Sequence, residues 1–320
     1  DVPIKLKNNL IFKNFENITE MYSMPKYNEV DPTPLLAPFY LIFFGMMVAD
    51  AGYGALVLIG SAIILKCFKL DEEKEKMLKF FFWLSIPTIV FGILFGSFFG
   101  DILNLTPIIN PIDDINTVLF LSLGMGLVHI FFGLGIKAYM LIRDGDPLGA
   151  LYDVGSWVMA LVGGGLFIAG GMIGLSATAI NIAKYVMIIG MAIIVFMSAR
   201  DIKNYGARIG SGLYNLYRIS GYVGDLVSYT RLMALGLAGG QLANAFNLII
   251  KMIPGWAIFV IGPIFFVFFH LFNIFLSMLG AYVHTCRLQY VEYFGKFYEG
   301  GGRSFSPFKI KNNYFQINRD

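Results

Sequence analysis

Charged side chains are scarce in this sequence of 320 residues. They make up 14% of the chain, whereas hydrophobic residues make up 57% and the mean hydropathy is +0.68. A soluble domain carries roughly a quarter of its residues as Asp, Glu, Lys and Arg, so this balance indicates an integral membrane protein. The net charge of +3 is too small to favour a nucleic acid or a polybasic surface anchor.

Sequence motifs of several enzyme classes are also missing. The chain contains no G-x-x-x-x-G-K-[ST] loop for nucleotides, no H-E-x-x-H zinc motif and no G-x-S-x-G nucleophile turn. Its two cysteines, Cys67 and Cys286, are too far apart in sequence to form a metal motif, and we expect packed thiols. We therefore do not expect the chain to hydrolyse nucleotides by itself, or to bind a metal or a cofactor.

Long apolar runs follow a polar beginning. Residues 1–34 are polar and punctuated by proline, and we interpret them as a cytoplasmic linker to an N-terminal domain that is missing from this sequence. We expect a transmembrane domain over 35–290 and a cytoplasmic tail over 291–320. Each apolar run is near or above the roughly 20 residues that cross a bilayer. The runs cover 35–66, 77–100, 117–142, 152–176, 181–200, 213–251 and 256–290.

Lysine collects in one of the connections between these runs. The connection at 66–79 carries five lysines, while the one at 101–117 carries neither Lys nor Arg. Because cytoplasmic loops are rich in Lys and Arg, the first should lie inside and the second outside. The run 35–66 must then enter and return as a hairpin of two short helices, with Asp50 at its tip. This gives eight helices and two cytoplasmic termini; seven spans, the alternative, would leave the lysines outside.

One arginine lies inside the apolar run 213–251. A permanent charge at bilayer depth, as at Arg231, costs at least about 2.5 kcal/mol even on a lenient insertion scale. Asp225 projects about 120° away on the same helix, so it is no partner. The counter-charge lies either on another subunit or within the chain, on Asp50, Glu292 or backbone carbonyls. A second helix can come close, because small residues share the helix face of the arginine: Gly224, Ser228, Ala234, Ala238 and Ala245.

The last apolar run carries a stripe of polar and small residues. Steps of three and four place its members on one helical face: His270, Asn273, Ser277, Gly280, His284 and Arg287. Polar groups in lipid must face protein or water, so we expect the stripe to line a cavity, a hydrated path or a partner helix. The two histidines are about 21 Å apart along a helix, which excludes a shared metal ion. The run 213–251 would measure about 58 Å, so we expect two long, tilted C-terminal helices.

Four blocks of the sequence resemble the membrane half of the large stator subunit of vacuolar-type and archaeal-type rotary ATPases, called subunit a or subunit I. In order, they are MYSMPKYNEVDPTPLLAPFYLIFFGMMVADAGYG, FGILFGSFFGD, GDLVSYTRLMALGLAGGQLA and HTCRLQYVEYFGKFYEGGGRSFSPF. The resemblance implies an all-α integral membrane protein, an eight-helix bundle with a cytoplasmic N-terminal domain. It also implies a static subunit that forms two ion half-channels against a proteolipid ring and couples ring rotation to transport of H⁺ or Na⁺.

The resemblance assigns roles to two arginines. Arg231 stands where the family has the arginine that faces the ring carboxylates, and Arg287 stands where it has a companion on the last helix. Eukaryotic relatives carry His at the position of Gly239 and Glu at that of Ser277, so half-channel groups assigned there do not transfer. The wording of these blocks resembles bacterial and archaeal members instead. Our half-channel candidates are Ser228, Gln241, Asn244, Asn273, Ser277 and His284.

The implied partners are the proteolipid ring, the peripheral-stalk and central-stalk subunits and membrane lipid, in a prokaryotic plasma membrane. ATP hydrolysis would occur in a separate soluble sector. The alternative is a stand-alone secondary transporter that binds an anionic substrate with Arg231. Against that alternative, the sequence shows no internal repeat of the kind that many transporters carry.

Overall fold

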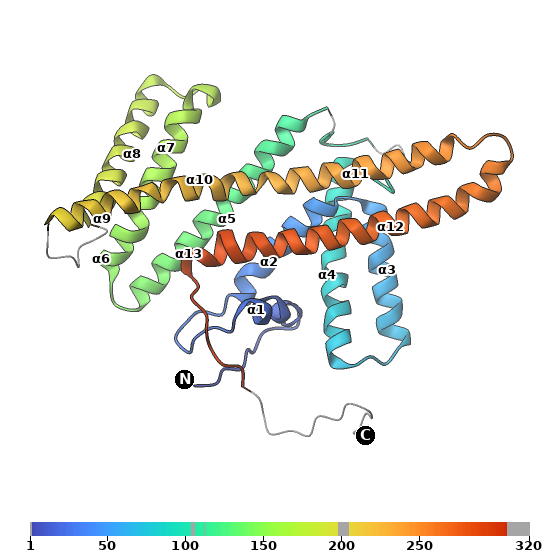
Figure 1. The fold of residues 1–320 in the computed structure, drawn as a ribbon, viewed down its shortest axis with the longest axis horizontal. Coiled ribbons are helices and arrows are strands. Elements are labelled where there is room, and N and C mark those ends of the chain that lie inside the picture. The colour runs from blue at the N-terminus through green and yellow to red at the C-terminus, as the bar shows by residue number, and fades with distance from the viewer. Residues whose placement is uncertain (1, 104–105, 112, 198–204, 306–320) are drawn as a thin grey trace.

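The computed structural model describes residues 2–103, 106–111, 113–197 and 205–305 (Figure 1). Within these ranges the fold is helical, and β-pairing is limited to isolated bridges. Two shorter apolar helices of 16 and 17 residues, Thr33–Val48 and Ala51–Cys67, precede the longer ones. Six helical stretches are long and apolar enough to cross a membrane: Glu72–Phe95, Ile115–Arg143, Pro147–Ile168, Ala177–Met197, Ile209–Lys251 and Ala257–Phe297. The all-α membrane fold is confirmed, whereas membrane crossing by both short helices stays a prediction.

The chain enters through a short helical segment and then turns sharply. The segment η1 (Phe12–Phe15) leads into α1 (Glu16–Tyr22), after which α2 (Thr33–Val48) and α3 (Ala51–Cys67) form the run predicted as a hairpin. Ala49, at φ 40°, makes the turn between them. The chain goes up and returns here, as the predicted hairpin requires, and α2 and α3 diverge from the turn because α4 packs against both (Figure 1).

Helix α4 (Glu72–Phe95) explains this divergence, because it packs against both α2 and α3. A Cβ at Gly45 of α2 would lie 2.8 Å from α4 atoms, and one at Gly92 of α4 would lie 2.0 Å from the backbone N of Ala51. Only glycine permits such close approach of two helix backbones. The α4 helix therefore packs between α2 and α3, in the angle that the two helices form at their turn.

The connections lie on two sides of the molecule. The lysine-rich connection from α3 to α4 is on the same side as the N-terminal segment, and the connection after α4 is on the opposite side (Figure 1). This separation agrees with the distribution of lysine in the sequence. Which side faces the cytoplasm stays a prediction.

The middle of the chain forms α5 (Ile115–Arg143) and a separate helix pair. After α5 come α6 (Pro147–Ala150), the π-helical turn η2 (Leu151–Gly155), α7 (Ser156–Ile173) and α8 (Ala177–Met197). The α7 and α8 helices pack along each other at one end of the molecule (Figure 1). The α5 helix passes behind the last helices, where it contacts α10, α11 and the π-helical segment that follows α12.

Two long helical stretches run side by side along the longest axis of the molecule (Figure 1). One consists of α9 (Tyr205–Tyr217), α10 (Ile219–Ser228) and α11 (Thr230–Lys251). The other consists of α12 (Ala257–Arg287), the π-helical segment η3 (Leu288–Phe294) and α13 (Gly295–Phe297). The α9–α11 stretch crosses α7 and α8 steeply at one end of the molecule, and the α12–α13 stretch crosses the direction of α3 and α4, as expected for long, tilted helices (Figure 1). The last helical stretch continues past residue 290, where we placed its end, because Tyr293 and Phe294 are fully buried.

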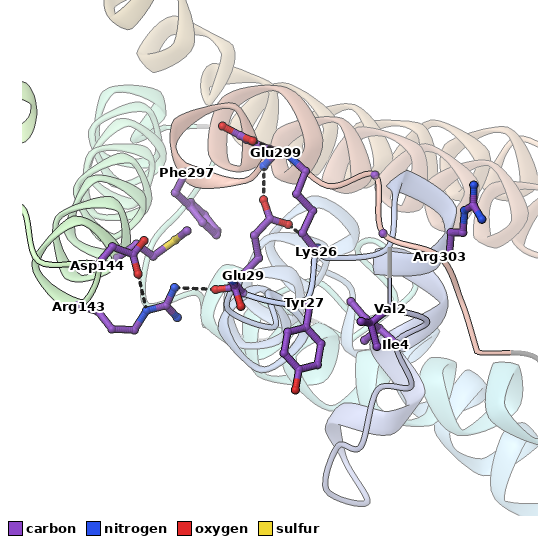
Figure 2. A pocket seen from close by; sticks show the side chains of 14 residues that line it. Val2, Ile4, Lys26, Tyr27, Glu29, Arg143, Asp144, Phe297, Glu299 and Arg303 are labelled. Carbon is purple, nitrogen blue, oxygen red and sulfur yellow. Dashed lines mark hydrogen bonds and ion pairs between the residues drawn. The ribbon is translucent and has the colours of Figure 1, made fainter.

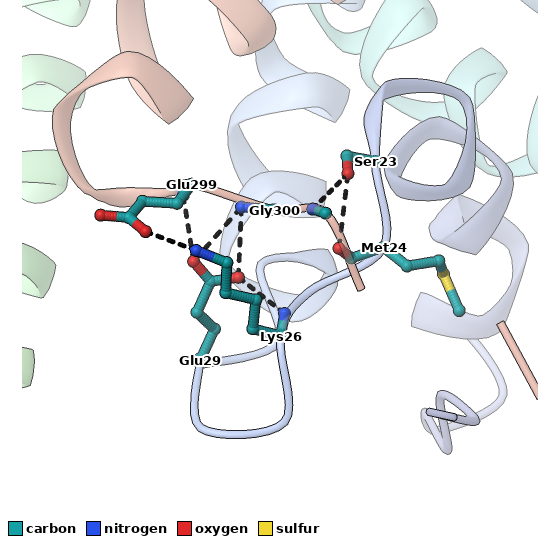
Figure 3. A network of polar contacts seen from close by, with 7 residues as sticks. Ser23, Met24, Lys26, Glu29, Glu299 and Gly300 are labelled. Carbon is teal, nitrogen blue, oxygen red and sulfur yellow. Dashed lines mark hydrogen bonds and ion pairs between the residues drawn. The ribbon is translucent and has the colours of Figure 1, made fainter. Parts of the chain in front are cut away.

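Residues 23–29 and 298–303 form a unit that we call the terminal clasp (Figure 3). Glu29 accepts hydrogen bonds from the backbone N–H groups of Glu299 and Gly300, and Lys26 pairs with Glu299 at 2.6 Å. Gly302 donates to the carbonyl of Met24. The first part of the predicted tail is thus tied to the predicted linker, while residues 306–320 of that tail lie outside the described residues.

Candidate functional site

Arg231 lies at a local break between two helices. The α10 helix ends at Ser228, α11 begins at Thr230, and Tyr229 stands between them. The Arg231 side chain is half-buried, and its Nη1 atom is buried with no hydrogen-bond partner in the part of the chain that the structure describes. Among the residues that the structure describes, no ion pair includes Arg231. The chain thus presents a guanidinium with donors left over.

Two charged residues of the last helical stretch lie within electrostatic range of Arg231. They are Arg287, which is exposed at the end of α12, and Glu292, which is buried in η3. One carboxylate oxygen of Glu292 has no hydrogen-bond partner in the described part of the chain, and the carboxylate lies close to the Ser228 hydroxyl. The π-helical geometry of η3 widens the turn between Arg287 and Glu292. Sequence reasoning predicted the arginine companion but not this wide turn.

Asp50 is excluded as the internal counter-charge. It is buried and caps α3, and it accepts four hydrogen bonds of 2.7–3.0 Å. These come from the Ser97 hydroxyl and from three backbone N–H groups of α3 and the loop after α4. Since a carboxylate with four donors is satisfied, Asp50 anchors that loop instead of reaching Arg231.

Asp225 is also committed elsewhere. Its carboxylate pairs with Lys296 of α13, and the Lys296 ammonium lies 3.9 Å from the centre of the Tyr222 ring. This ion pair ties α10 to the end of the last helical stretch. It agrees with the expectation that Asp225 points away from Arg231.

The polar stripe of α12 divides into two parts. In the first part, His270 and Asn273 belong to what we call the paired network, together with Tyr53, Asn247 and Asp101. Asn273 donates to the Tyr53 hydroxyl at 2.8 Å, and that hydroxyl shares a 2.8 Å hydrogen bond with Nδ1 of His270. Ser277 continues the network through a 3.3 Å bond to Asn273.

The direction of every hydrogen bond in the paired network is set. Because Asn247 donates through its amide nitrogen, its Oδ1 accepts from His270 Nε2 at 3.0 Å, and Nδ1 of that tautomer accepts from the Tyr53 hydroxyl. Asn247 in turn donates to Asp101 at 2.8 Å. The first half of the stripe therefore locks α3 and α11 to α12 through satisfied groups.

The second part of the stripe lies beside the arginines and is not satisfied. His284 is within electrostatic range of Arg231 and Arg287, and its Nδ1 atom is buried with no partner in the described chain. Ser228 is half-buried on α10, and its hydroxyl donates to the backbone carbonyl of Gly224 at 3.1 Å. We call Arg231, His284, Arg287 and Glu292 the unpaired group.

A cavity of about 280 Å³, between α11 and the loop after α4, brings together the other two half-channel candidates. Gln241 and Asn244 line it with Asp101 and Gly236, and the Asn244 side-chain oxygen has no hydrogen-bond partner within the described ranges. Gly236 is five residues beyond Arg231, about 7.5 Å along a helix. The cavity thus begins near the arginine and extends to the side of the molecule opposite the terminal clasp.

A cavity of about 540 Å³ lies at the terminal clasp, far from these residues in the fold (Figure 2). Its charged walls are largely neutralised by contacts within the chain. Arg143 bonds to Asp144 at 3.0 Å and to the backbone carbonyl of Asn28, and Lys26 pairs with Glu299. This cavity therefore offers less unused polar capacity than the surroundings of Arg231.

The family of the chain follows from comparison with known proteins. The family model described as "V-type ATPase 116kDa subunit family" matches residues 1–106 and 219–310, which include both arginines and the terminal clasp. The chain belongs to this V-type ATPase 116 kDa subunit family. The unmatched internal part, 107–218, holds all of α5 and the α7–α8 pair.

The chain is similar to subunit I proteins from archaea and bacteria. The chain is 37% identical to the A-type ATP synthase subunit I of Pyrococcus horikoshii over 99% of its own length. It is 34% identical over 98% to the A-type ATP synthase subunit I of Methanocaldococcus jannaschii, and 27% identical over 92% to the V-type ATP synthase subunit I of Borreliella burgdorferi. It covers 49%, 50% and 51% of these relatives, so it spans about half of their length.

Proposed function

We propose that this chain is the membrane part of the static subunit of a V/A-type rotary ATPase. It would form two ion half-channels against a ring of proteolipid subunits and couple the rotation of that ring to transport of H⁺ or Na⁺. The observation that carries the proposal is the buried, unpartnered Nη1 of Arg231. A charged group at bilayer depth needs a partner, and a carboxylate that arrives on another subunit supplies one.

The fixed cation gives the mechanism its electrostatic step. As a ring carboxylate approaches Arg231, the guanidinium stabilises the ionised form of that carboxylate and favours release of its bound ion. Once the carboxylate has moved on, it can bind an ion again from the other side. The same positive charge repels cations and so opposes direct leakage between the two half-channels.

The surroundings of Arg231 suggest where the two half-channels lie. The cavity lined by Gln241 and Asn244 suits one of them, because it opens beside α11 and contains an amide oxygen free to bind water. Ser228, Glu292 and His284 suit the other, on the side of the terminal clasp. Asn273 and Ser277 hold α12 in place beside the first cavity.

The partners follow from this role. The proteolipid ring would face Arg231, while the stalk subunits and a soluble sector would supply ATP-driven rotation. The archaeal and bacterial relatives favour a prokaryotic plasma membrane. This chain would not hydrolyse ATP itself.

The substitution Arg231→Ala tests the proposal in the intact complex. We expect ATP-driven ion transport to be lost while the complex still assembles with its ring, because only the charge that meets the ring is removed. The measurement is ion uptake into vesicles during ATP hydrolysis, with the sodium and protonophore dependence of turnover reporting the ion. Arg143→Ala, at an exposed arginine bonded to Asp144, is the matched control and should pump normally. Normal pumping by Arg231→Ala would reject the assignment.

A further inference from the structure

A histidine of α5 contacts the chain next to Arg231. His129 is fully buried, and its Nδ1 atom lies 2.8 Å from the hydroxyl of Tyr229, which is also fully buried. Tyr229 stands at the break between α10 and α11, two residues before Arg231. The hydrogen bond therefore fixes the point at which the arginine-bearing helix begins.

The Tyr229 ring has little freedom to move. Gly126, one helical turn before His129, makes room for it, because a Cβ there would lie 2.3 Å from the ring. Phe43 of α2 packs edge-on against the ring with centroids 5.8 Å apart. A ring held on two sides and at its hydroxyl sets the backbone position beneath it.

The same histidine contacts the segment that follows Arg287. The His129 ring stacks on Tyr293 of η3, with centroids 4.2 Å apart and an interplanar angle of 20°. Tyr293 is fully buried, and Gln289 of the same segment lies close to the His129 ring. One side chain of α5 thus contacts the flanks of both arginines.

We propose that His129 is a positioning residue that holds Arg231 and Arg287 at a fixed separation for the ring carboxylates. The alternative to positioning is a purely structural role, in which the hydrogen bond of this core histidine only stabilises the fold. A positioning role is favoured because the contacts are to Tyr229 and Tyr293, which flank the two arginines, and because Tyr229 occupies the break from which α11 starts. His129 has this role only if Arg231 meets the ring carboxylates, as proposed above.

The test removes one hydroxyl from the intact complex. Tyr229→Phe keeps the aromatic ring and deletes the bond to His129. Because small misplacements of reacting groups have large effects on rate, we expect the ions transported per ATP to fall by roughly three- to tenfold. The ring should still co-purify and ATP hydrolysis should continue, so the loss is one of coupling.

Variants of His129 separate positioning from stability. His129→Leu should lose coupling as Tyr229→Phe does, whereas His129→Asn, whose amide reaches the position of Nδ1, should restore most of it. The double variant of Tyr229→Phe with His129→Leu should lose no more coupling than either change alone, because both delete one contact. If His129→Leu does not assemble, Tyr229→Phe and His129→Asn still decide the outcome.

The matched control is Tyr298→Phe, which deletes the 2.7 Å bond from a buried tyrosine hydroxyl to the Ser23 carbonyl in the terminal clasp. It should leave coupling unchanged. Full coupling in Tyr229→Phe, or an equal loss in Tyr298→Phe, would overturn the role of His129. If either of these results occurs while Arg231→Ala abolishes transport, only the positioning role is rejected. Normal pumping by Arg231→Ala would reject the proposed function itself.

Discussion

The contact between α11 and α12 contains two polar regions that look alike in sequence and differ in the structure. The paired network around Tyr53 and His270 satisfies its buried groups with bonds of 2.7–3.0 Å. The unpaired group leaves buried atoms of Arg231, His284 and Glu292 without partners in the described chain. Each region has members on both α11 and α12, and both contribute to the same stripe of α12.

This difference shows that polarity inside a membrane segment serves two purposes. A closed set of hydrogen bonds fixes helices against one another, since leaving any member unpaired is costly. An open set has capacity left for water, for an ion or for another subunit. The paired network lies where α3 reaches α11 and α12, while the unpaired group lies where no carboxylate of the described chain forms an ion pair with Arg231.

The largest effect is expected from Arg231→Lys, which keeps the charge of the unpaired group. An ammonium lacks the planar fork of the guanidinium and can lose its proton when buried. We expect ATP-driven transport to fall by about 100-fold, as for loss of a group that stabilises developing charge. Ion uptake by the assembled complex measures this, with Arg143→Lys as the control. Near-normal uptake would show that charge alone suffices and would weaken the contrast between the two regions.

A smaller effect, on stability, is expected from Tyr53→Phe in the paired network. The change leaves Nδ1 of buried His270 and the amide of buried Asn273 without one partner each, which costs about 1–3 kcal/mol. We expect less complex to survive heating in detergent, while transport per surviving complex is retained.

Tyr139→Phe, at an exposed tyrosine of α5, is the control for this change. It should leave the heat resistance of the complex unaltered. If Tyr53→Phe lowered transport per complex and left heat resistance intact, the paired network would belong to the ion path, and the comparison would fail.

The smallest effect is expected from Gln241→Leu, in the cavity beside α11. An apolar side chain there removes a group that can bind water without burying a charge. We expect transport to fall roughly twofold when the ion is limiting on that side, and to recover when the ion is abundant. An equal loss at all ion concentrations would place Gln241 outside the entry path.

Several features of the site followed from local sequence alone. Arg231 stood out because a charge within an apolar run is costly, and the step pattern of α12 placed His270, Asn273 and His284 on one face. Glu292 was considered as an internal counter-charge for Arg231, but the wide turn of η3 that holds it there was not predicted, because nothing in the local sequence marks a π-helix. His129 was missed because a lone polar residue in an apolar helix gives no sign of its partners.

The predicted hairpin of α2 and α3 is present, but the way α4 packs against its two arms was not predicted, for a similar reason. The sequence indicated the turn at Ala49 and Asp50 correctly, since the charge pattern required the chain to enter and return. It predicted the apolar run of α4 but not its neighbours: Gly92 of α4 approaches the backbone of that turn closely. Local composition indicates where the chain turns back, whereas the shapes of the helix surfaces decide which helices pack against each other.

The sequence by itself determined that this is a helical membrane protein, roughly where its apolar helices lie along the chain, and which arginine carries an unusual cost. Hydrophobicity and helical period are local properties, so they can be read along the chain. Only the tertiary structure decided that Asp50 accepts four hydrogen bonds and that one part of the α12 stripe is hydrogen-bonded while the other is not. It also decided that His129 contacts residues near both arginines. Those facts depend on contacts between residues that are distant in sequence, and a single sequence does not encode them in any local pattern.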